Sequence, residues 1–182
     1  MKKIILFLIL IVFASSSHNS KTAHPSKTTH PSKTTHPTKT THPSQSSHFS
    51  HHSTKNCQVN DRNIQRKAKE LEGKTKEETA RNIFKYVQTQ IKYEKYTNSQ
   101  KGVANTLWTK RGNFFDQTHL LVALWRAAGI DARYAHGPNN WWGQCIINGK
   151  TYDCDPTNQK HEFGRRRHPI PIYAKYYEEL DH

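Results

Sequence analysis

Cysteine is scarce in this chain, and the cysteines present have no metal-site spacing. The sequence has 182 residues and three cysteines, Cys57, Cys145 and Cys154. No CxxC pair or regular Cys/His spacing predicts a zinc site, so we expect neither a metal nor another cofactor. An odd number of cysteines leaves at least one thiol without a partner inside a single chain.

Long apolar runs are also missing, with one exception at the N-terminus. Residues 4–14 are apolar, follow Lys2 and Lys3, and precede three serines. This pattern is typical of a secretory signal peptide, and the run is shorter than the roughly 20 residues that cross a membrane. We expect residues 1–17 to be a signal peptide, or an N-terminal anchor if uncleaved. The protein is then secreted and associated with the cell envelope, and it touches the membrane only through this segment.

Acidic side chains are absent from the first 55 residues, which contain seven lysines. These residues carry half of the net charge of +14, and the rest of the chain carries the other half. Nucleic acid is the usual partner of so basic a protein. For an exported protein an anionic envelope polymer is the better match to this charge, so we expect no nucleic acid partner.

Residues 18–55 form a low-complexity repeat in which a histidine recurs every six residues. The core unit is Lys-Thr-Thr-His-Pro-Ser, and the segment has one aromatic residue, Phe49, and no aliphatic side chain larger than alanine. Such a segment cannot bury enough apolar surface to offset its ordering entropy, so we predict a disordered, extended linker. The composition leaves open whether it is only a spacer, carries O-glycans, chelates metal ions or binds an acidic polymer.

The folded domain is predicted to span residues 56–182 and to begin with two amphipathic helices. Asn60 or Asp61 can cap the first of them. Thr75 and Glu78 form a capping box for the second. The apolar residues that follow each cap recur at helical spacing, which predicts one buried face on each helix.

A third helix, over residues 115–128, is the most apolar and is expected to be central. Gly129 is suited to end it. Before this helix we expect a short turn at residues 106–108. After it, the tyrosine-rich C-terminus is expected to form a last helix over residues 172–180.

Strands are predicted between the third helix and the C-terminus. Residues 132–135 form one strand, and residues 141–147 and 150–155 form two more, joined by Asn148 and Gly149. Asn-Gly between two strand patterns indicates a hairpin with a type I′ turn. Helices followed by an antiparallel sheet predict an α+β domain, in which the central helix packs on the sheet.

The hairpin predicts a register that brings two polar residues together. A two-residue loop pairs Gln144 with Asp153, and it places Asn140 diagonally opposite Asp155, within about 7–8 Å. In a catalytic triad, a base on one strand can be oriented by a carboxylate on the neighbouring strand, and these two positions have that arrangement. The mouth of the third helix is expected on the same face.

The mouth of the third helix is where a thiol enzyme would place its nucleophile, because a helix N-terminus stabilises a thiolate. The chain reads Gly112-Asn113-Phe114 at this point. Phe114 has no nucleophilic atom. The sequence therefore indicates a catalytic scaffold and, at the same position, argues against the catalysis.

Four segments of the domain match the pattern of a known family. They are residues 56–61, 80–87, 112–137, which include Gly-Asn-Phe-Phe-Asp-Gln-Thr-His-Leu-Leu, and 143–158, which end in Asp-Pro-Thr-Asn. In these segments the chain resembles the archaeal transglutaminase-like cysteine peptidases, pseudomurein endoisopeptidases among them. The resemblance covers about residues 56–164. It implies a papain-like fold, a Cys-His-Asp triad, and cleavage of an isopeptide bond or acyl transfer through a thioester.

Carried over residue by residue, the resemblance leaves this triad incomplete. Phe114 stands at the nucleophile position. Asn140 stands at the base position, after a loop over residues 137–139 that is shorter than the family's. Only Asp155 is of the expected type.

Other residues are expected to have supporting roles at the site. Trp108, Trp142 and Gln144 are expected to bind the substrate. His136, at the end of a strand near the site, is the best replacement for the missing base. Two cysteines are expected to be small buried apolar residues or disulfide partners: Cys145 and Cys154.

Three hypotheses on function follow. The first is a catalytically inactive transglutaminase-like domain that binds a cell-wall peptide or modulates an active relative. The second is an active cysteine peptidase or acyltransferase of cell-wall peptides with a rearranged site. The third is a basic tethering protein whose domain only supports the histidine-rich segment, and wall binding that survives deletion of residues 56–182 would favour it.

Overall fold

The structure is a computed structural model that describes residues 49–98, 101–138, 140–165 and 174–179. The predicted signal peptide and the linker up to residue 48 lie outside the described residues. Within the described ranges, no helix has both the length and the apolar character that a membrane crossing requires.

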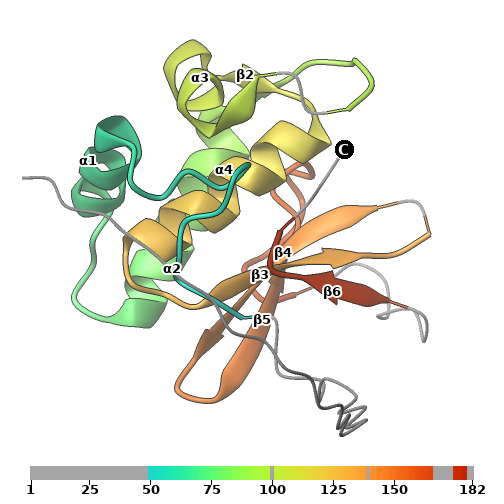
Figure 1. Cartoon of the computed structure of the whole chain (residues 1–182). Coiled ribbons are helices and arrows are strands. Elements are labelled where there is room, and N and C mark those ends of the chain that lie inside the picture. Colours follow the sequence, from blue (N-terminus) through green and yellow to red (C-terminus); the bar gives the residue numbers. More distant parts are fainter. Residues whose placement is uncertain (1–48, 99–100, 139, 166–173, 180–182) are drawn as a thin grey trace, which may run out of the picture. The chain divides into compact units, whose positions relative to one another are not determined.

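Four helices make up one side of the domain (Figure 1). They are α1 (Arg62–Glu70), α2 (Lys76–Gln90), α3 (Gly102–Thr109) and α4 (Phe114–Ala127). The predicted caps are confirmed for the first two, because Asp61 accepts from two amide groups of α1 and Thr75 accepts from the amide of Glu78. The Glu78 carboxylate accepts from the amide of Lys74 at 2.8 Å, one residue earlier than a capping box predicts.

Helix α4 is central, as predicted. It contacts the other three helices and also strands of the main sheet (Figure 1). Every side chain from Leu120 to Trp125 is buried, as expected for an apolar helix that is surrounded by other elements. The indole nitrogen of Trp125 donates to the main-chain oxygen of Ala80 at 3.1 Å, which ties α2 to α4.

The main sheet has four antiparallel strands in the order β5-β4-β3-β6. They are β3 (Ala132–His136), β4 (Trp141–Ile147), β5 (Lys150–Cys154) and β6 (Lys175–Tyr177). Asn148 and Gly149 have φ angles of 52° and 76°, as the predicted type I′ turn requires, and Gln144 pairs with Asp153. The α+β class and the hairpin register are thus confirmed.

Two local predictions are wrong, and one pairing was not foreseen. Residues 106–108 belong to helix α3 instead of forming a turn. The described part of the predicted C-terminal helix contains strand β6, which pairs with β3, because a strand edge satisfies backbone groups that a short isolated helix would leave to the solvent. A small parallel pair of β1 (Lys92–Tyr93) and β2 (Arg111–Gly112) precedes α4.

The folded domain also begins earlier than residue 56. Ser50 and Ala132 exchange two backbone hydrogen bonds of 3.1 and 2.8 Å on the edge of β3 opposite β4. The buried guanidinium of Arg126 donates to the main-chain oxygens of His52, Ala132 and Glu178. Residues 50–55, which were assigned to the linker, therefore pack as part of the domain.

Candidate functional site

Asn140 and Asp155 meet at the open end of the β4–β5 hairpin. Asn140 Nδ2 donates to Asp155 Oδ2 at 3.0 Å, so the proximity that the register predicted is confirmed. Asp155 is buried, and its other carboxylate oxygen accepts from the amide and the hydroxyl of Thr157 at 3.0 and 2.6 Å. This Asx turn was not predicted, although an aspartate two residues before a threonine is a signal for it.

His161, which no sequence pattern predicted at the site, also lies beside Asp155. His161 Nδ1 is 3.6 Å from Asp155 Oδ2, and the two side chains are 12% and 8% exposed. At this separation the pair is not hydrogen-bonded, but a protonated ring would attract the carboxylate. The main-chain oxygen of His161 accepts from Gln88 Nε2 at 2.8 Å, which anchors the loop to α2. No periodicity marks His161, because it lies in an irregular loop after β5.

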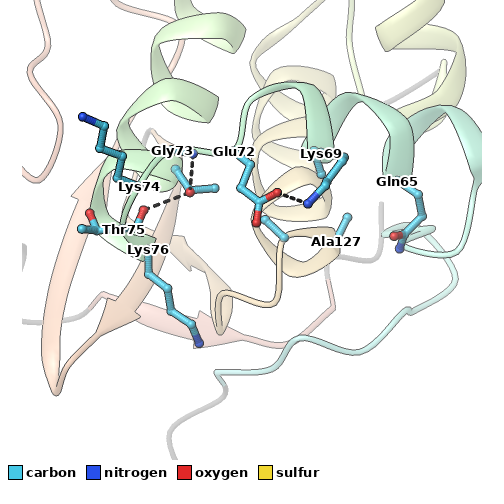
Figure 2. Close-up of a pocket in the computed structure, with 11 residues that line it drawn as sticks. Gln65, Lys69, Glu72, Gly73, Lys74, Thr75, Lys76 and Ala127 are labelled. Atoms are coloured by element: carbon cyan, nitrogen blue, oxygen red, sulfur yellow. Dashed lines mark hydrogen bonds and ion pairs between the residues drawn. The ribbon is translucent and has the colours of Figure 1, made fainter.

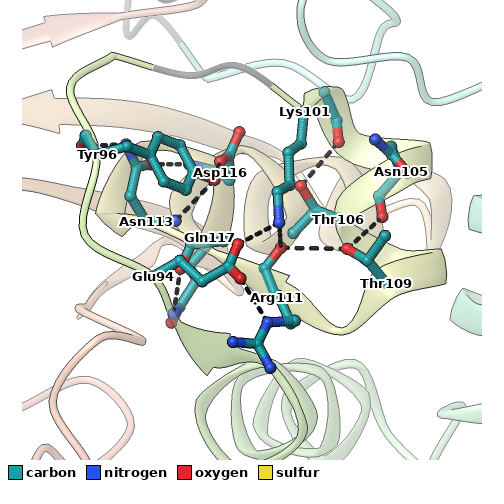
Figure 3. Close-up of polar contacts among 12 residues, drawn as sticks. Glu94, Tyr96, Lys101, Asn105, Thr106, Thr109, Arg111, Asn113, Asp116 and Gln117 are labelled. Atoms are coloured by element: carbon teal, nitrogen blue, oxygen red, sulfur yellow. Dashed lines mark hydrogen bonds and ion pairs between the residues drawn. The ribbon is translucent and has the colours of Figure 1, made fainter.

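Phe114 is the first residue of α4 and directly follows the N-cap, Asn113. The segment before the helix holds this start in place (Figure 3). Asn113 Nδ2 donates to the main-chain oxygens of Tyr96 and Asn98, and the Tyr96 hydroxyl donates to the buried carboxylate of Asp116. Burial and the Asp116 carboxylate raise the pKa of Tyr96, which keeps it a donor. The position that the sequence resemblance assigns to the nucleophile is therefore well fixed.

The Phe114 ring begins a cluster of half-buried aromatic side chains, which we call the aromatic cluster. Ring centroids are 4.2 Å apart for Phe114 and Phe115, 6.0 Å for Phe115 and Trp141, and 5.9 Å for Trp141 and Tyr177. His136 stacks on Trp141 at 3.7 Å with an interplanar angle of 8°. Burial and the ammonium of Lys175 lower the pKa of His136. His136, expected as a replacement base, is thus a stacking partner of Trp141.

Helix α4 packs on the face of the sheet that carries Gly143. A Cβ atom at Gly143 would lie 3.1 Å from Leu121 and 3.4 Å from Val122 of α4. Strand alternation places Trp141 on the same face. The ring of Phe115, in the first turn of α4, lies 6.0 Å from that of Trp141, so the mouth of α4 reaches this end of the sheet. Asn140 directly precedes β4, and the expectation that it shares a face with the helix mouth stays a prediction.

Trp142 and Gln144 do not line a substrate groove, which corrects the sequence-based expectation. They are 0% and 2% exposed. Trp142 Nε1 and Gln144 Nε2 both donate to Asp153 Oδ1 at 2.6 Å, and Arg133 Nε donates to Gln144 Oε1 at 2.8 Å. These side chains hydrogen-bond to each other across β3, β4 and β5, and their contacts stabilise the sheet.

Two hollows lie away from Asn140 and Asp155. One, of about 400 Å³, lies between α1, the α1–α2 loop and the end of α4 (Figure 2). Several of its polar groups bond to each other, since Lys69 pairs with Glu72 and the Thr79 hydroxyl accepts from the amide of Gly73. The other, of about 280 Å³, lies between α1, α2 and α3. Trp108, expected in a substrate groove, lines this second hollow and is 84% exposed.

All three cysteines are buried free thiols. Burial raises the pKa of Cys57, of Cys145 and of Cys154. Because the thiolate is the reactive species, a buried thiol of raised pKa is a poor nucleophile. Across the described ranges, no group of three or more His, Cys, Asp and Glu side chains is placed to hold a metal ion.

Comparison with known proteins agrees with the fold. The sequence profile of the transglutaminase-like superfamily matches residues 65–156. The chain is similar to a candidate cysteine protease from Cytophaga hutchinsonii, with 25% identity and a TM-score of 0.51 over 60% of this chain and 41% of that one. It thus spans about two fifths of the length of that protein. A candidate protease from Parabacteroides distasonis matches with 13% identity and a TM-score of 0.46 over 50% of this chain and 22% of that one. No curated protein matches the chain.

Proposed function

The chain belongs to the transglutaminase-like superfamily, and on that premise we propose that it is a secreted, catalytically inactive member. We propose that it binds a cell-wall peptide, or modulates an active relative, at the cell envelope. The segments that resemble the pseudomurein endoisopeptidases make an archaeal pseudomurein peptide the first ligand to test. The basic, histidine-rich linker supports a location close to an anionic envelope polymer.

One observation carries the proposal: the positions of the nucleophile and the base hold residues that cannot do their chemistry. Acyl transfer through a thioester needs a thiolate that attacks the carbonyl and an imidazole that accepts and returns a proton. Phe114 provides neither a lone pair nor an acidic proton. Asn140 has an amide that is neutral at any physiological pH, and it donates to Asp155. The Asp155 carboxylate thus still accepts a hydrogen bond, as it would from an imidazole, but the Asn140 amide cannot take up a proton as an imidazole can.

The aromatic cluster supports the binding part of the proposal. Its rings come from the start of α4 and from β3, β4 and β6, and all remain partly exposed. Aromatic side chains provide large contact areas at low entropic cost, which is why they dominate peptide-binding surfaces. Phe114 in place of a cysteine adds an apolar surface at the position where a substrate carbonyl would otherwise meet the thiol.

The alternative function is an active peptidase or acyltransferase with a rearranged site. The position of His161 beside Asp155 favours it, because this pair has the composition of a base and its orienting carboxylate. The alternative still requires a nucleophile, and burial raises the pKa of each of the three thiols. The inactive reading needs no such addition, so we prefer it.

A single experiment separates the two functions. The full chain is incubated with a pseudomurein-type peptide, with and without prior iodoacetamide, and the mixture is followed by mass spectrometry and by calorimetry. We expect binding without cleavage and without a thioester adduct. Peptide cleavage that iodoacetamide abolishes would refute the inactive function and establish the alternative.

A further inference from the structure

We propose that the hollow beside Trp108 is a binding site for an acidic saccharide unit. This hollow is the one of about 280 Å³ between α1, α2 and α3, and we call it the Trp108 hollow. It contains none of Phe114, Asn140 and Asp155. The proposal therefore stands independently of the function proposed for those residues.

Trp108 is the feature that requires an explanation. Its side chain is 84% exposed, whereas the preceding residue, Leu107, is 8% exposed and packs in the core. An indole buries about 150–250 Å² when it finds a partner, and exposed apolar surface beside a concavity marks an interaction site. Trp108 lies on a regular helix, so its exposure does not result from a disordered loop.

The floor of the Trp108 hollow is apolar and aromatic. Leu107, Ala104 and the half-buried ring of Tyr86 line it next to Trp108. The Lys67 ammonium lies 5.1 Å from the centroid of the Tyr86 ring and thereby fixes one wall. The hollow thus has a flat exposed indole on one side and a firm apolar floor, which suits a ring-shaped ligand.

The rim of the Trp108 hollow is basic. Arg66, Lys67 and Lys110 line it together with a single carboxylate, Glu70. Glu70 pairs with Lys67 and, at 4.0 Å, with Arg66, so three cations share one carboxylate and the rim keeps an excess of positive charge. Arg66 donates to Asn63 Oδ1 at 2.9 Å, which positions it while its side chain stays 71% exposed. A concavity lined by one sign of charge attracts a ligand of the opposite sign.

An acidic saccharide fits these features better than a peptide. The walls are three helices, whose main-chain groups bond within each helix, so no strand edge is offered to an extended peptide. A sugar ring has a flat C–H face that packs on an indole, and a carboxylate on the ring gives Arg66 and Lys110 a partner. The volume lies just below the usual range for ligand pockets, about 300–1,000 Å³, which suits a single ring. A nucleic acid strand would need several stacking platforms in a row.

The test is a titration of the full chain with oligogalacturonate, a chain of uronic acids, monitored by acrylamide quenching of tryptophan fluorescence. Trp125 and Trp142 are buried and Trp141 is half-buried, so Trp108, which is 84% exposed, is expected to dominate the quenching and to become protected on binding. Trp108→Ala removes the fluorescent reporter, so its affinity is measured by isothermal titration calorimetry beside the parent protein, and it should be weaker by at least about tenfold. The matched control is Tyr93→Ala, because Tyr93 is 53% exposed on β1 and does not line the hollow, and it should leave binding unchanged.

The charges and the ligand class are tested in the same assay. Arg66→Gln combined with Lys110→Gln should weaken binding and reduce its dependence on salt. Thermal denaturation checks that each variant folds, which the exposure of these side chains leads us to expect. Unchanged affinity in Trp108→Ala would overturn the proposal. Equal affinity for a neutral cellodextrin, or tighter binding of oligothymidylate, would overturn the acidic saccharide as the ligand.

Discussion

The amide of Asn140 donates to the carboxylate of Asp155 at 3.0 Å, and the sequence resemblance assigns these two residues to the positions of the superfamily's imidazole and its orienting carboxylate. The amide reproduces the donor of an imidazole N–H and omits the second nitrogen that accepts a proton. We therefore interpret the contact as structural, and its contribution to the free energy of unfolding can be measured.

Removal of Asn140 and removal of Asp155 should both destabilise the domain, and removal of Asp155 should cost more. Asn140→Ala deletes one hydrogen bond and should lower the free energy of unfolding by about 1 kcal/mol. Asp155→Ala also strips the Thr157 amide and hydroxyl of their acceptor, so we expect a loss of about 1–3 kcal/mol. Urea denaturation provides the measurement, with Thr151→Ala on the exposed side of β5 as the control. If the two losses simply add in the double variant, the residues are not coupled and our interpretation of the pair is wrong.

A thiol at the mouth of α4 should be unusually reactive. In Phe114→Cys the new side chain lies at the first position of a 14-residue helix, where the aligned peptide dipoles lower a thiol pKa. We expect iodoacetamide to alkylate it at neutral pH much faster than it alkylates Cys57, Cys145 or Cys154. Phe115→Cys, one residue further along, is the matched control.

Addition of Asn140→His to Phe114→Cys tests whether the catalytic arrangement survives. If the base position can still reach the helix mouth, hydrolysis of a pseudomurein-type peptide should appear. We expect hydrolysis, because the side chain at position 140 already contacts the Asp155 carboxylate, which can orient an imidazole. A folded but inactive double variant would show that residue 140 does not reach the mouth of α4.

Gly143 permits the close approach of α4 to the sheet. In Gly143→Ala the new methyl group would lie 3.0 Å from Trp125 and 3.1 Å from Leu121, both fully buried. Overpacking of this kind costs about 1–3 kcal/mol. Thermal or urea denaturation should show the loss, and a variant as stable as the parent would mean that α4 can shift freely.

Stability should rise with pH over the range in which histidine titrates, partly because of His136. Burial and Lys175 lower the pKa of His136 in the folded protein, while in the unfolded chain it titrates near its ordinary value of roughly 6.5. As the pH falls below that value, the unfolded state takes up the proton first, so the free energy of unfolding decreases. His136→Phe preserves a ring against Trp141 and should flatten this slope in urea denaturation at pH 5 and pH 7. An unchanged slope would contradict the assignment.

The parts of the fold that could be predicted are those with a local chemical signal. Asp61 and Thr75 mark helix starts, and Asn148-Gly149 marks the hairpin and its register, because each acts through bonds within a few residues. Helix α3 has no such mark, since Lys101 at its N-cap makes no side-chain capping bond. Strand β6 is decided by the edge of β3, about 40 residues away, so its own tyrosine-rich sequence was a poor guide.

The contact between Asn140 and Asp155 was predictable, but the surroundings of these two residues were not. The hairpin register brought Asn140 to Asp155 without knowledge of the rest of the fold. The burial of Trp142 and Gln144 depends on Arg133 and Asp153, which belong to two other strands. The approach of His161 depends on a loop that Gln88 of α2 holds in place. Tertiary contacts of this kind leave no periodic trace in a sequence.

Arg126 makes the two ends of the domain depend on each other. Its guanidinium binds main-chain oxygens from the segment that enters the domain and from the last described strand region, at His52 and Glu178. Removal of either segment would leave a buried cation short of acceptors, which is costly. A protease that trims this protein from its N-terminus should therefore stop near Ser50, and a shortened C-terminus should expose a new cleavage point at the opposite end.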